Sequence, residues 1–153
     1  MSESTRSEVM EAVNRLGYSM DTGNWVGVRG CLADTLYTDY TSLVGGDPAD
    51  VVADDLVAAW KQAIEPLDAI QHVVGSHIVS LGSGEAVCTA QVICTHRFGE
   101  REPGVADLWS VAGHYEYKLS QVEGVWKIHS AVFTLLWETG DRGVMERAAN
   151  AVS

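Results

Sequence analysis

Histidine is the side chain best suited to exchanging protons near neutral pH, and this sequence contains five histidines. His96 ends the run AVCTAQVICTH, in which every second residue from Ala86 to Cys94 is small or apolar. Because alternate residues of a strand face the same side of a sheet, this pattern predicts that His96 faces the core. A histidine in that place is either an acid–base residue or a structural residue with satisfied nitrogens. His77, His114 and His129 have outward or ambiguous alternation, so we expect them at the surface.

The three cysteines, Cys31, Cys88 and Cys94, form no CxxC motif. Cys88 and Cys94 fall on one predicted strand, where their separation is too great for a disulfide. We expect all three to be reduced and buried as small apolar side chains, with a catalytic thiol as the alternative.

Motifs for bound cofactors are missing from the sequence. No group of His, Cys, Asp and Glu residues has the short spacing of metal ligands, so we expect no metal site. GxGxxG, Walker-type and GxSxG sequences are also missing. Chemistry in this chain would therefore depend on its own side chains, and we expect no cofactor.

The composition limits the possible partners. The chain has 153 residues, of which 46% are hydrophobic, and its formal net charge is −11. This length predicts a single domain over residues 1–153. The excess of acidic residues argues against nucleic-acid and anionic-membrane partners, which need a basic surface. The N-terminal segment lacks an apolar run and no apolar stretch is long enough to span a membrane, so we expect a cytoplasmic protein.

Two periodicities indicate the elements that position these residues. Apolar residues at helical spacing predict an N-terminal helix that includes Val9, Val13, Leu16 and Met20, and a shorter one from Trp25 to Leu32. A third helix is predicted to begin at Pro48, behind the N-cap Asp47, and to end near Pro66. The segment LYTDYTSL (36–43) is typical of a strand between the second and third helices.

From residue 71 the period changes to two, which predicts a run of strands. These are 72–81, 86–98, 108–122 and 125–138, followed by a short C-terminal helix. Hairpin turns are expected at 82–84 and 123–124, and a longer loop at 99–107. Helices that precede hairpin-linked strands predict an α+β fold with a mainly antiparallel sheet.

The facing of the side chains predicts a cavity. The small residues of 86–96 would lie beside an aromatic-rich face on the next strand, which comprises Trp109, Val111, Gly113, Tyr115, Tyr117 and Leu119. Such a pair of faces allows a sheet to curve over an internal space. The alternative is ordinary core packing.

Three segments, MDTGNWVGVRGCLADTLYTDY, IQHVVGSHIV and GVWKIHSAVFTLLW, resemble the SnoaL-like branch of the nuclear transport factor 2-like superfamily. The resemblance covers residues 7–145 and is nearest to the scytalone dehydratase-like enzymes. It implies a cone-shaped, cystatin-like α+β barrel, in which a curved sheet wraps a pocket closed by the N-terminal helices. The superfamily includes dehydratases, cyclases, isomerases and non-catalytic binding modules, so it implies a pocket and not a particular reaction.

The resemblance also assigns candidate catalytic residues. It pairs Asp21, at the end of the first helix, with His96, and it makes His72 the histidine of a Gln-His motif and Tyr40 the pocket tyrosine. The Asp21–His96 pair would remove a proton next to a carbonyl, and Tyr40 would stabilise the enolate oxygen. His72 would protonate or orient the leaving hydroxyl. The alternatives are a helix-end turn for Asp21 and an ordinary sheet aromatic for Tyr40.

The same resemblance indicates a remodelled pocket. Met20, Gly113 and Tyr115 stand where these enzymes have tyrosine, serine and asparagine. We expect the substrate-binding side chains to be Tyr18, Trp60, Trp109 and Tyr115, although Tyr18 also fits a place in the core.

Together these features predict a cofactor-independent lyase or isomerase of the dehydratase or cyclase type. Its substrate would be a hydrophobic, oxygenated small molecule such as a polyketide, aromatic or steroid intermediate. The alternative is a non-catalytic module that binds a small ligand or a partner subunit. We also expect a homodimer or homotrimer, because Phe133, Leu135 and Trp137 would form an apolar face that another copy covers.

Overall fold

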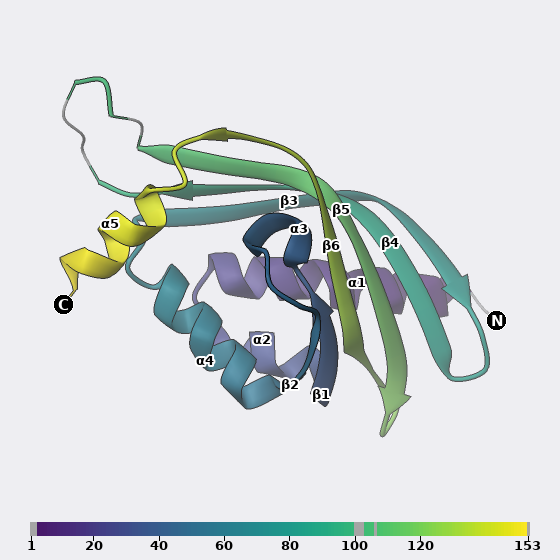
Figure 1. Cartoon of the computed structure of the whole chain (residues 1–153). Helices are drawn as coiled ribbons and strands as arrows, with labels where there is room; N and C mark the ends of the chain where they lie inside the picture. Colours follow the sequence, from purple (N-terminus) through teal and green to yellow (C-terminus); the bar gives the residue numbers. More distant parts are fainter. Residues whose placement is uncertain (1–2, 100–102, 106, 153) are drawn as a thin grey trace.

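A curved sheet forms one side of the structure, and helices pack on its concave face (Figure 1). The computed structural model describes residues 3–99, 103–105 and 107–152. Within these residues the helices are α1 (Glu3–Asp21), α2 (Trp25–Gly30), α3 (Thr41–Val44), α4 (Ala53–Ile64) and α5 (Val144–Ala151). The strands are β1 (Leu32–Asp39), β2 (Ala49–Val52), β3 (Ala69–Leu81), β4 (Glu85–Arg97), β5 (Leu108–Val122) and β6 (Val125–Gly140). None of the described helices is both long and apolar enough to cross a membrane.

In the described part of the chain, the strands form one sheet in the order β2-β1-β6-β5-β4-β3. β1 is parallel to β6, and the other neighbouring pairs are antiparallel. The sheet keeps two edges, at β2 and β3, so it curves without closing into a full barrel (Figure 1). The predicted α+β class with a curved, mainly antiparallel sheet is confirmed.

α1 packs its apolar stripe against the sheet and lies close to β3. The four stripe residues are all buried, as their spacing predicted: Val9, Val13, Leu16 and Met20. Gly17 permits the close approach, because a Cβ atom there would lie 3.1 Å from the Cβ of His72. The last turn of α1 therefore reaches β3 beside His72.

The predicted strand over 36–43 is only partly correct. β1 begins earlier, at Leu32, and ends at Asp39, and the following residues form the short helix α3. The Asp39 carboxylate accepts the backbone N–H of Thr41 at 3.0 Å and its hydroxyl at 2.7 Å. Such local hydrogen bonds favour a turn over continued strand pairing, so β1 stops before Tyr40.

The helix predicted to begin at Pro48 begins instead at Ala53. The intervening residues form β2, in which Val51 pairs with Leu36 of β1. Two consecutive β-branched valines favour this extended conformation over a first helical turn. The predicted end of the helix near Pro66 is confirmed, since α4 ends at Ile64.

The four strands after residue 69 agree with the predicted strands to within a few residues. The predicted turn at 123–124 is also present, where Glu123 and Gly124 have φ angles of 53° and 80°. Both angles lie in the left-handed region that tight hairpin turns require. Residues 100–102 and 106 of the predicted 99–107 loop lie outside the described residues.

The residues Phe133, Leu135 and Trp137, predicted to share an exposed apolar face, do not form one in the structure. Phe133 is buried and stacks on Tyr40, so it is not available at the surface. The register between β5 and β6 shifts at Ala112/Gly113, which interrupts the alternation. Leu136 and Trp137 are the exposed apolar side chains here, at 58% and 49%. Assembly into a dimer or trimer stays a prediction.

Candidate active site

A cavity of about 510 Å³ lies between the concave face of the sheet and the helices. Its walls are mainly apolar, and α1, α3, α4 and α5 all contribute to them. Its polar side chains include His72, His96, Tyr40 and Tyr115. The exposed side chains of Val44 and Arg142 also line it, so the cavity reaches the surface near α3 and α5. Its size and apolar lining suit a small organic ligand.

Asp21 binds His72, and not His96 as the family resemblance implied. The Asp21 Oδ1 atom lies 2.6 Å from His72 Nδ1, and its Oδ2 atom accepts the backbone N–H of His72 at 2.7 Å. A carboxylate oxygen only accepts, so Nδ1 carries the proton. Asp21 does not line this cavity and acts on it through His72.

The charge of His72 follows from its surroundings. Burial lowers the pKa of His72, but its hydrogen bond to Asp21 and the nearby Cys94 outweigh burial and raise the pKa to about 10. His72 is therefore an imidazolium at neutral pH. Its positive charge lies at the cavity wall and is balanced by the Asp21 carboxylate.

His96 has different partners and faces the same cavity. Its Nδ1 donates to the backbone carbonyl of Trp109 at 3.0 Å, and its ring stacks on the Trp109 indole with centroids 4.6 Å apart. Because a carbonyl only accepts, the Nδ1 proton is fixed and the Nε2 atom of neutral His96 keeps a lone pair. Nε2 lies 3.7 Å from the Cys94 sulfur. The sequence prediction that His96 faces the core is confirmed.

Cys94 lies between the two imidazoles because of the strand register. Cys94 on β4 is directly opposite His72 on β3, and His96 is two residues farther along β4 on the same face. Burial raises the pKa of the Cys94 thiol, but the nearby His72 and His96 lower the pKa to about 7. The predicted reduced, buried state is confirmed for all three cysteines. The periodicity of the strand placed Cys94 on the correct face but contained no signal of these partners.

Two tyrosines add hydroxyl groups to the cavity. Tyr40 and Tyr115 meet edge to face, with ring centroids 6.3 Å apart. Burial raises the pKa of Tyr40 to about 12, and burial together with Tyr40 raises the pKa of Tyr115 well above its usual value. Both hydroxyls therefore keep their protons at neutral pH and can donate to a bound oxygen.

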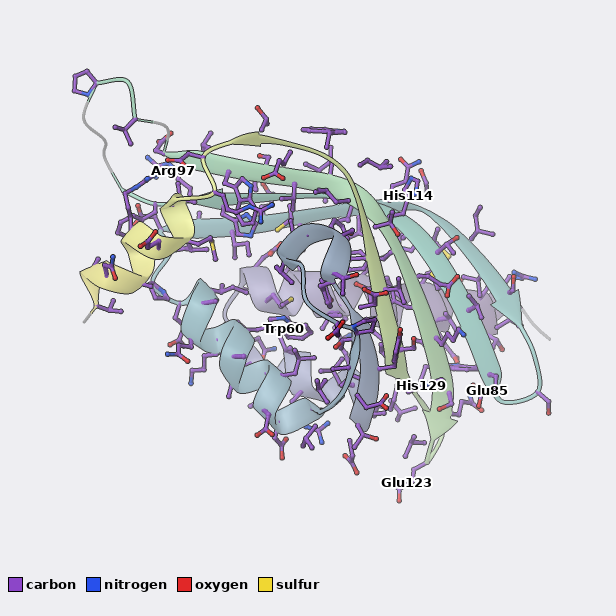
Figure 2. The ribbon with its side chains drawn as sticks, viewed as in Figure 1. Trp60, Glu85, Arg97, His114, Glu123 and His129 are labelled. Atoms are coloured by element: carbon purple, nitrogen blue, oxygen red, sulfur yellow. The ribbon has the colours of Figure 1, made fainter. Side chains whose placement is uncertain are left out.

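Three of the four predicted substrate-binding residues line the cavity, namely Trp60, Trp109 and Tyr115. Figure 2 shows Trp60 on α4, in the space between the helix and the sheet. Tyr18 is the exception, because it is 72% exposed and lies in neither the cavity wall nor the core. It is two residues from both Leu16 and Met20, which places it about 200° around the helix from the buried stripe.

One cavity residue that the sequence did not indicate, Arg142, comes from the C-terminal part of the chain. Arg142 lies over the Trp109 ring, 5.2 Å from its centroid, and makes a 2.9 Å ion pair with Glu138. Its Nη1 donates to the carbonyl of Leu43 at 2.8 Å. Arg142 thus connects α3 to the end of β6 at the open side of the cavity, which local periodicity cannot reveal.

The remaining histidines lie away from this cavity. His114 is exposed on the convex side of the sheet, and His129 pairs with Glu85 at 3.3 Å near the far end (Figure 2). His77 is half-buried, contrary to the surface prediction, and burial lowers its pKa. Within residues 3–99, 103–105 and 107–152, no group of three or more His, Cys, Asp and Glu side chains could hold a metal ion.

Comparison with known proteins agrees with this architecture. The family model described as a SnoaL-like domain matches residues 2–132. The chain belongs to the SnoaL-like domain family. Among the solved structures similar to this SnoaL-like protein is one described as a putative dehydratase from the NTF2-like family of Streptomyces avermitilis, which is 11% identical, with a TM-score of 0.75 over 89% of this chain and 99% of its own. No curated protein sequence matches it.

Three solved structures illustrate the likeness of fold. A protein from Kribbella flavida is 24% identical, with a TM-score of 0.85 over 95% of this chain and 98% of its own. A putative scytalone dehydratase from Novosphingobium aromaticivorans is 14% identical, with a TM-score of 0.75 over 90% and 88%. A hexachlorocyclohexane dehydrochlorinase is 15% identical, with a TM-score of 0.70 over 92% and 90%. The SnoaL-like fold is thus shared with proteins named for elimination reactions.

Proposed function

We propose that this SnoaL-like protein is a cofactor-independent lyase that eliminates water from a hydrophobic β-hydroxy carbonyl compound. The observation that carries the proposal is the unequal pair of imidazoles in one apolar cavity. His72 is held as a cation by Asp21, whereas His96 has its Nδ1 fixed by a carbonyl and a lone pair on Nε2. One ring is suited to give a proton and the other to take one.

The proposed reaction uses each group once. His96 Nε2 removes the proton from the carbon next to the substrate carbonyl. The hydroxyls of Tyr40 and Tyr115 donate to the carbonyl oxygen and stabilise the developing enolate. The enolate electrons form the new double bond as the β-hydroxyl leaves, and the His72 imidazolium protonates this hydroxyl to give water.

The apolar walls have two roles in this scheme. Trp60 and the other large side chains of the cavity bind the hydrophobic part of the substrate and displace water from it. A less aqueous surrounding strengthens the hydrogen bonds that act on the enolate oxygen. A polyketide, aromatic or steroid intermediate with a β-hydroxy ketone would meet these requirements. Two structural relatives, a dehydratase and a dehydrochlorinase, are named for the same class of reaction, elimination.

The test uses a β-hydroxytetralone, whose dehydration gives a naphthol that is detected by its absorbance. The wild-type protein should form naphthol, and His96→Asn and His72→Asn should each lower kcat by roughly 100-fold, as expected for loss of a general base or acid. His114→Asn is the matched control, because His114 is exposed on the convex side of the sheet. Its kcat should equal that of the wild type.

Two results would overturn the proposal. Equal activity in His96→Asn and His114→Asn would exclude His96 as the base. Tight binding of naphthol without turnover of the tetralone would favour the alternative, a SnoaL-like module that binds a small ligand without transforming it.

A further inference from the structure

Cys94 differs from the other two cysteines in the partners of its sulfur. The Cys31 thiol donates to the carbonyl of Gly27 at 3.3 Å, and the Cys88 thiol lies 3.8 Å from the carbonyl of Thr89. A carbonyl accepts a hydrogen bond from a thiol but cannot stabilise a thiolate. In agreement, burial raises the pKa of Cys31 and raises that of Cys88 to about 11. These two side chains are ordinary buried thiols.

The groups around Cys94 instead favour a thiolate. The His72 imidazolium lies directly opposite it on β3, and this nearby positive charge lowers the pKa of the thiol. The Nε2 atom of His96 lies 3.7 Å away on β4, where its lone pair can accept the thiol proton, and the Tyr115 hydroxyl, which stays protonated, lines the same cavity from β5. The Asp21 carboxylate of α1 is separated from the sulfur by the His72 ring, where it preserves the positive charge. Thiolates paired with an imidazolium are the nucleophilic cysteines of proteins.

The Cys94 sulfur is also reachable by small molecules. Although Cys94 is buried in the protein, it lines the 510 Å³ cavity together with both histidines and both tyrosines. That cavity reaches the surface beside Val44, which is 70% exposed. Cys88 does not line this cavity, and Cys31 lies in a separate surface groove beside α1. Among these three cysteines, only Cys94 therefore has both a thiol with a lowered pKa and a sulfur that small molecules in the cavity can reach.

We propose that Cys94 is a covalent capture site for α,β-unsaturated ketones that enter the cavity. The hydroxyls of Tyr40 and Tyr115 donate to the ketone oxygen, which makes the β-carbon more electrophilic. A sulfur lone pair forms a C–S bond to that carbon, and the π electrons of the double bond move to the α-carbon to give an enolate. A proton from His72 then neutralises the enolate, so the adduct is a saturated thioether that contains every atom of the ketone.

This activity goes beyond the proposed lyase reaction and does not depend on it. Capture needs only a thiolate, a polarised carbonyl and an open cavity, whereas elimination needs His96 as a base. The two are linked by chemistry, since dehydration of a β-hydroxy ketone yields a conjugated ketone of the type that Cys94 would capture. They are measured separately, because capture is scored by mass and elimination by turnover.

The experiment incubates the native protein at pH 7 with cyclohexenone and follows the intact mass over time, with fragment analysis to locate the adduct. We expect a single rapid addition of the whole mass of the probe at Cys94. Reaction at Cys31 and Cys88 should be roughly 10-fold slower or more, since few of those thiols are ionised at pH 7. In urea the protein is unfolded, so the three cysteines should react with cyclohexenone at similar rates. This control shows that the probe itself does not prefer one cysteine.

Variants distinguish activation of the Cys94 thiol by His72 from simple exposure of its sulfur to the cavity. Cys94→Ser should lose the rapid addition, and Cys88→Ser should keep it. His72→Asn removes the cation beside the sulfur, so the pH midpoint of alkylation at Cys94 should rise from about 7. The proposal is overturned if native Cys94 reacts no faster than Cys31 and Cys88. It is also overturned if His72→Asn leaves both the rate and the pH midpoint unchanged, because exposure alone would then explain the reaction.

Discussion

The Asp21 carboxylate holds both the backbone and the side chain of His72. One oxygen accepts the His72 backbone N–H at 2.7 Å and the other pairs with Nδ1 at 2.6 Å. Both side chains are largely buried, at 15% and 10% exposure, so water screens the pair only weakly. The contact joins the C-terminal end of α1 to β3 and keeps a positive charge at the cavity wall.

Replacement of Asp21 by asparagine should lower the pKa of His72. The amide removes the negative charge, while burial continues to oppose protonation of the ring. We expect the pKa to fall from about 10 toward its ordinary value of 6.5, with Cys94 still acting to raise it. A pH titration of the His72 ring by NMR measures this change. Asp55→Asn, on the exposed side of α4, is the control and should leave the titration unchanged, and a similar titration in Asp21→Asn would refute the role of Asp21.

The Asp21–His72 pair should also make stability depend on pH. Because folding raises the His72 pKa above 6.5, the stabilisation is fully present below pH 6.5 and is lost as pH rises through about 10. At pH 6.5, Asp21→Asn should reduce the free energy of unfolding by about 2 kcal/mol, the value of a hydrogen bond to a charged group. The difference between the two proteins should shrink steadily toward pH 10.

Urea unfolding at several pH values checks this prediction. Both proteins should carry Cys94→Ser, since the lowered pKa of Cys94 adds a pH dependence of the opposite sign. Because Cys94 also raises the pKa of His72, the difference in this background should vanish below pH 10. If the free energies of unfolding of the two proteins differ by a constant amount between pH 6.5 and 10, His72 is not charged in the folded protein.

Gly113 should tolerate no side chain. A Cβ atom there would lie 2.1 Å from the backbone oxygen of Thr134 and 2.8 Å from the Phe133 ring, where the register of β5 and β6 shifts. Gly113→Ala should therefore cost about 3 kcal/mol of stability, at the upper end of the effects of overpacking. The measurement is a thermal or urea melt. Gly75→Ala on β3 is the matched control, because nothing lies within 4 Å of a Cβ atom there, and equal losses in both variants would contradict the steric argument.

Gly113 also explains a departure from the dehydratase pattern. The resemblance placed a serine of those enzymes at this position, but the close approach of β6 leaves no space for its side chain. Polar groups on this side of the cavity come instead from Tyr115, two residues farther along the same face.

Much of the fold was accessible from periodicity. The stripe of Val9, Val13, Leu16 and Met20 predicted the buried face of α1, and the alternation of β4 predicted that Cys94 and His96 face inward. These features depend only on the 3.6- and 2-residue repeats of helix and strand. The segments around Asp39 and Val51 were predicted less well. The predicted strand ends early because Asp39 accepts a hydrogen bond from the backbone of Thr41, and the predicted helix starts late because Val51 pairs with β1.

The sequence by itself determined which side chains could do chemistry and which faces they occupy, since both follow from residue type and position in a repeat. The tertiary structure decided their partners. Asp21 meets His72 and not His96 because Gly17 lets α1 approach β3. Cys94 lies between the histidines because β3 and β4 pair in one register of many. The packing distance between α1 and β3 and the register of the strands arise from contacts between residues far apart in the chain, so the local spacing of residues does not predict them.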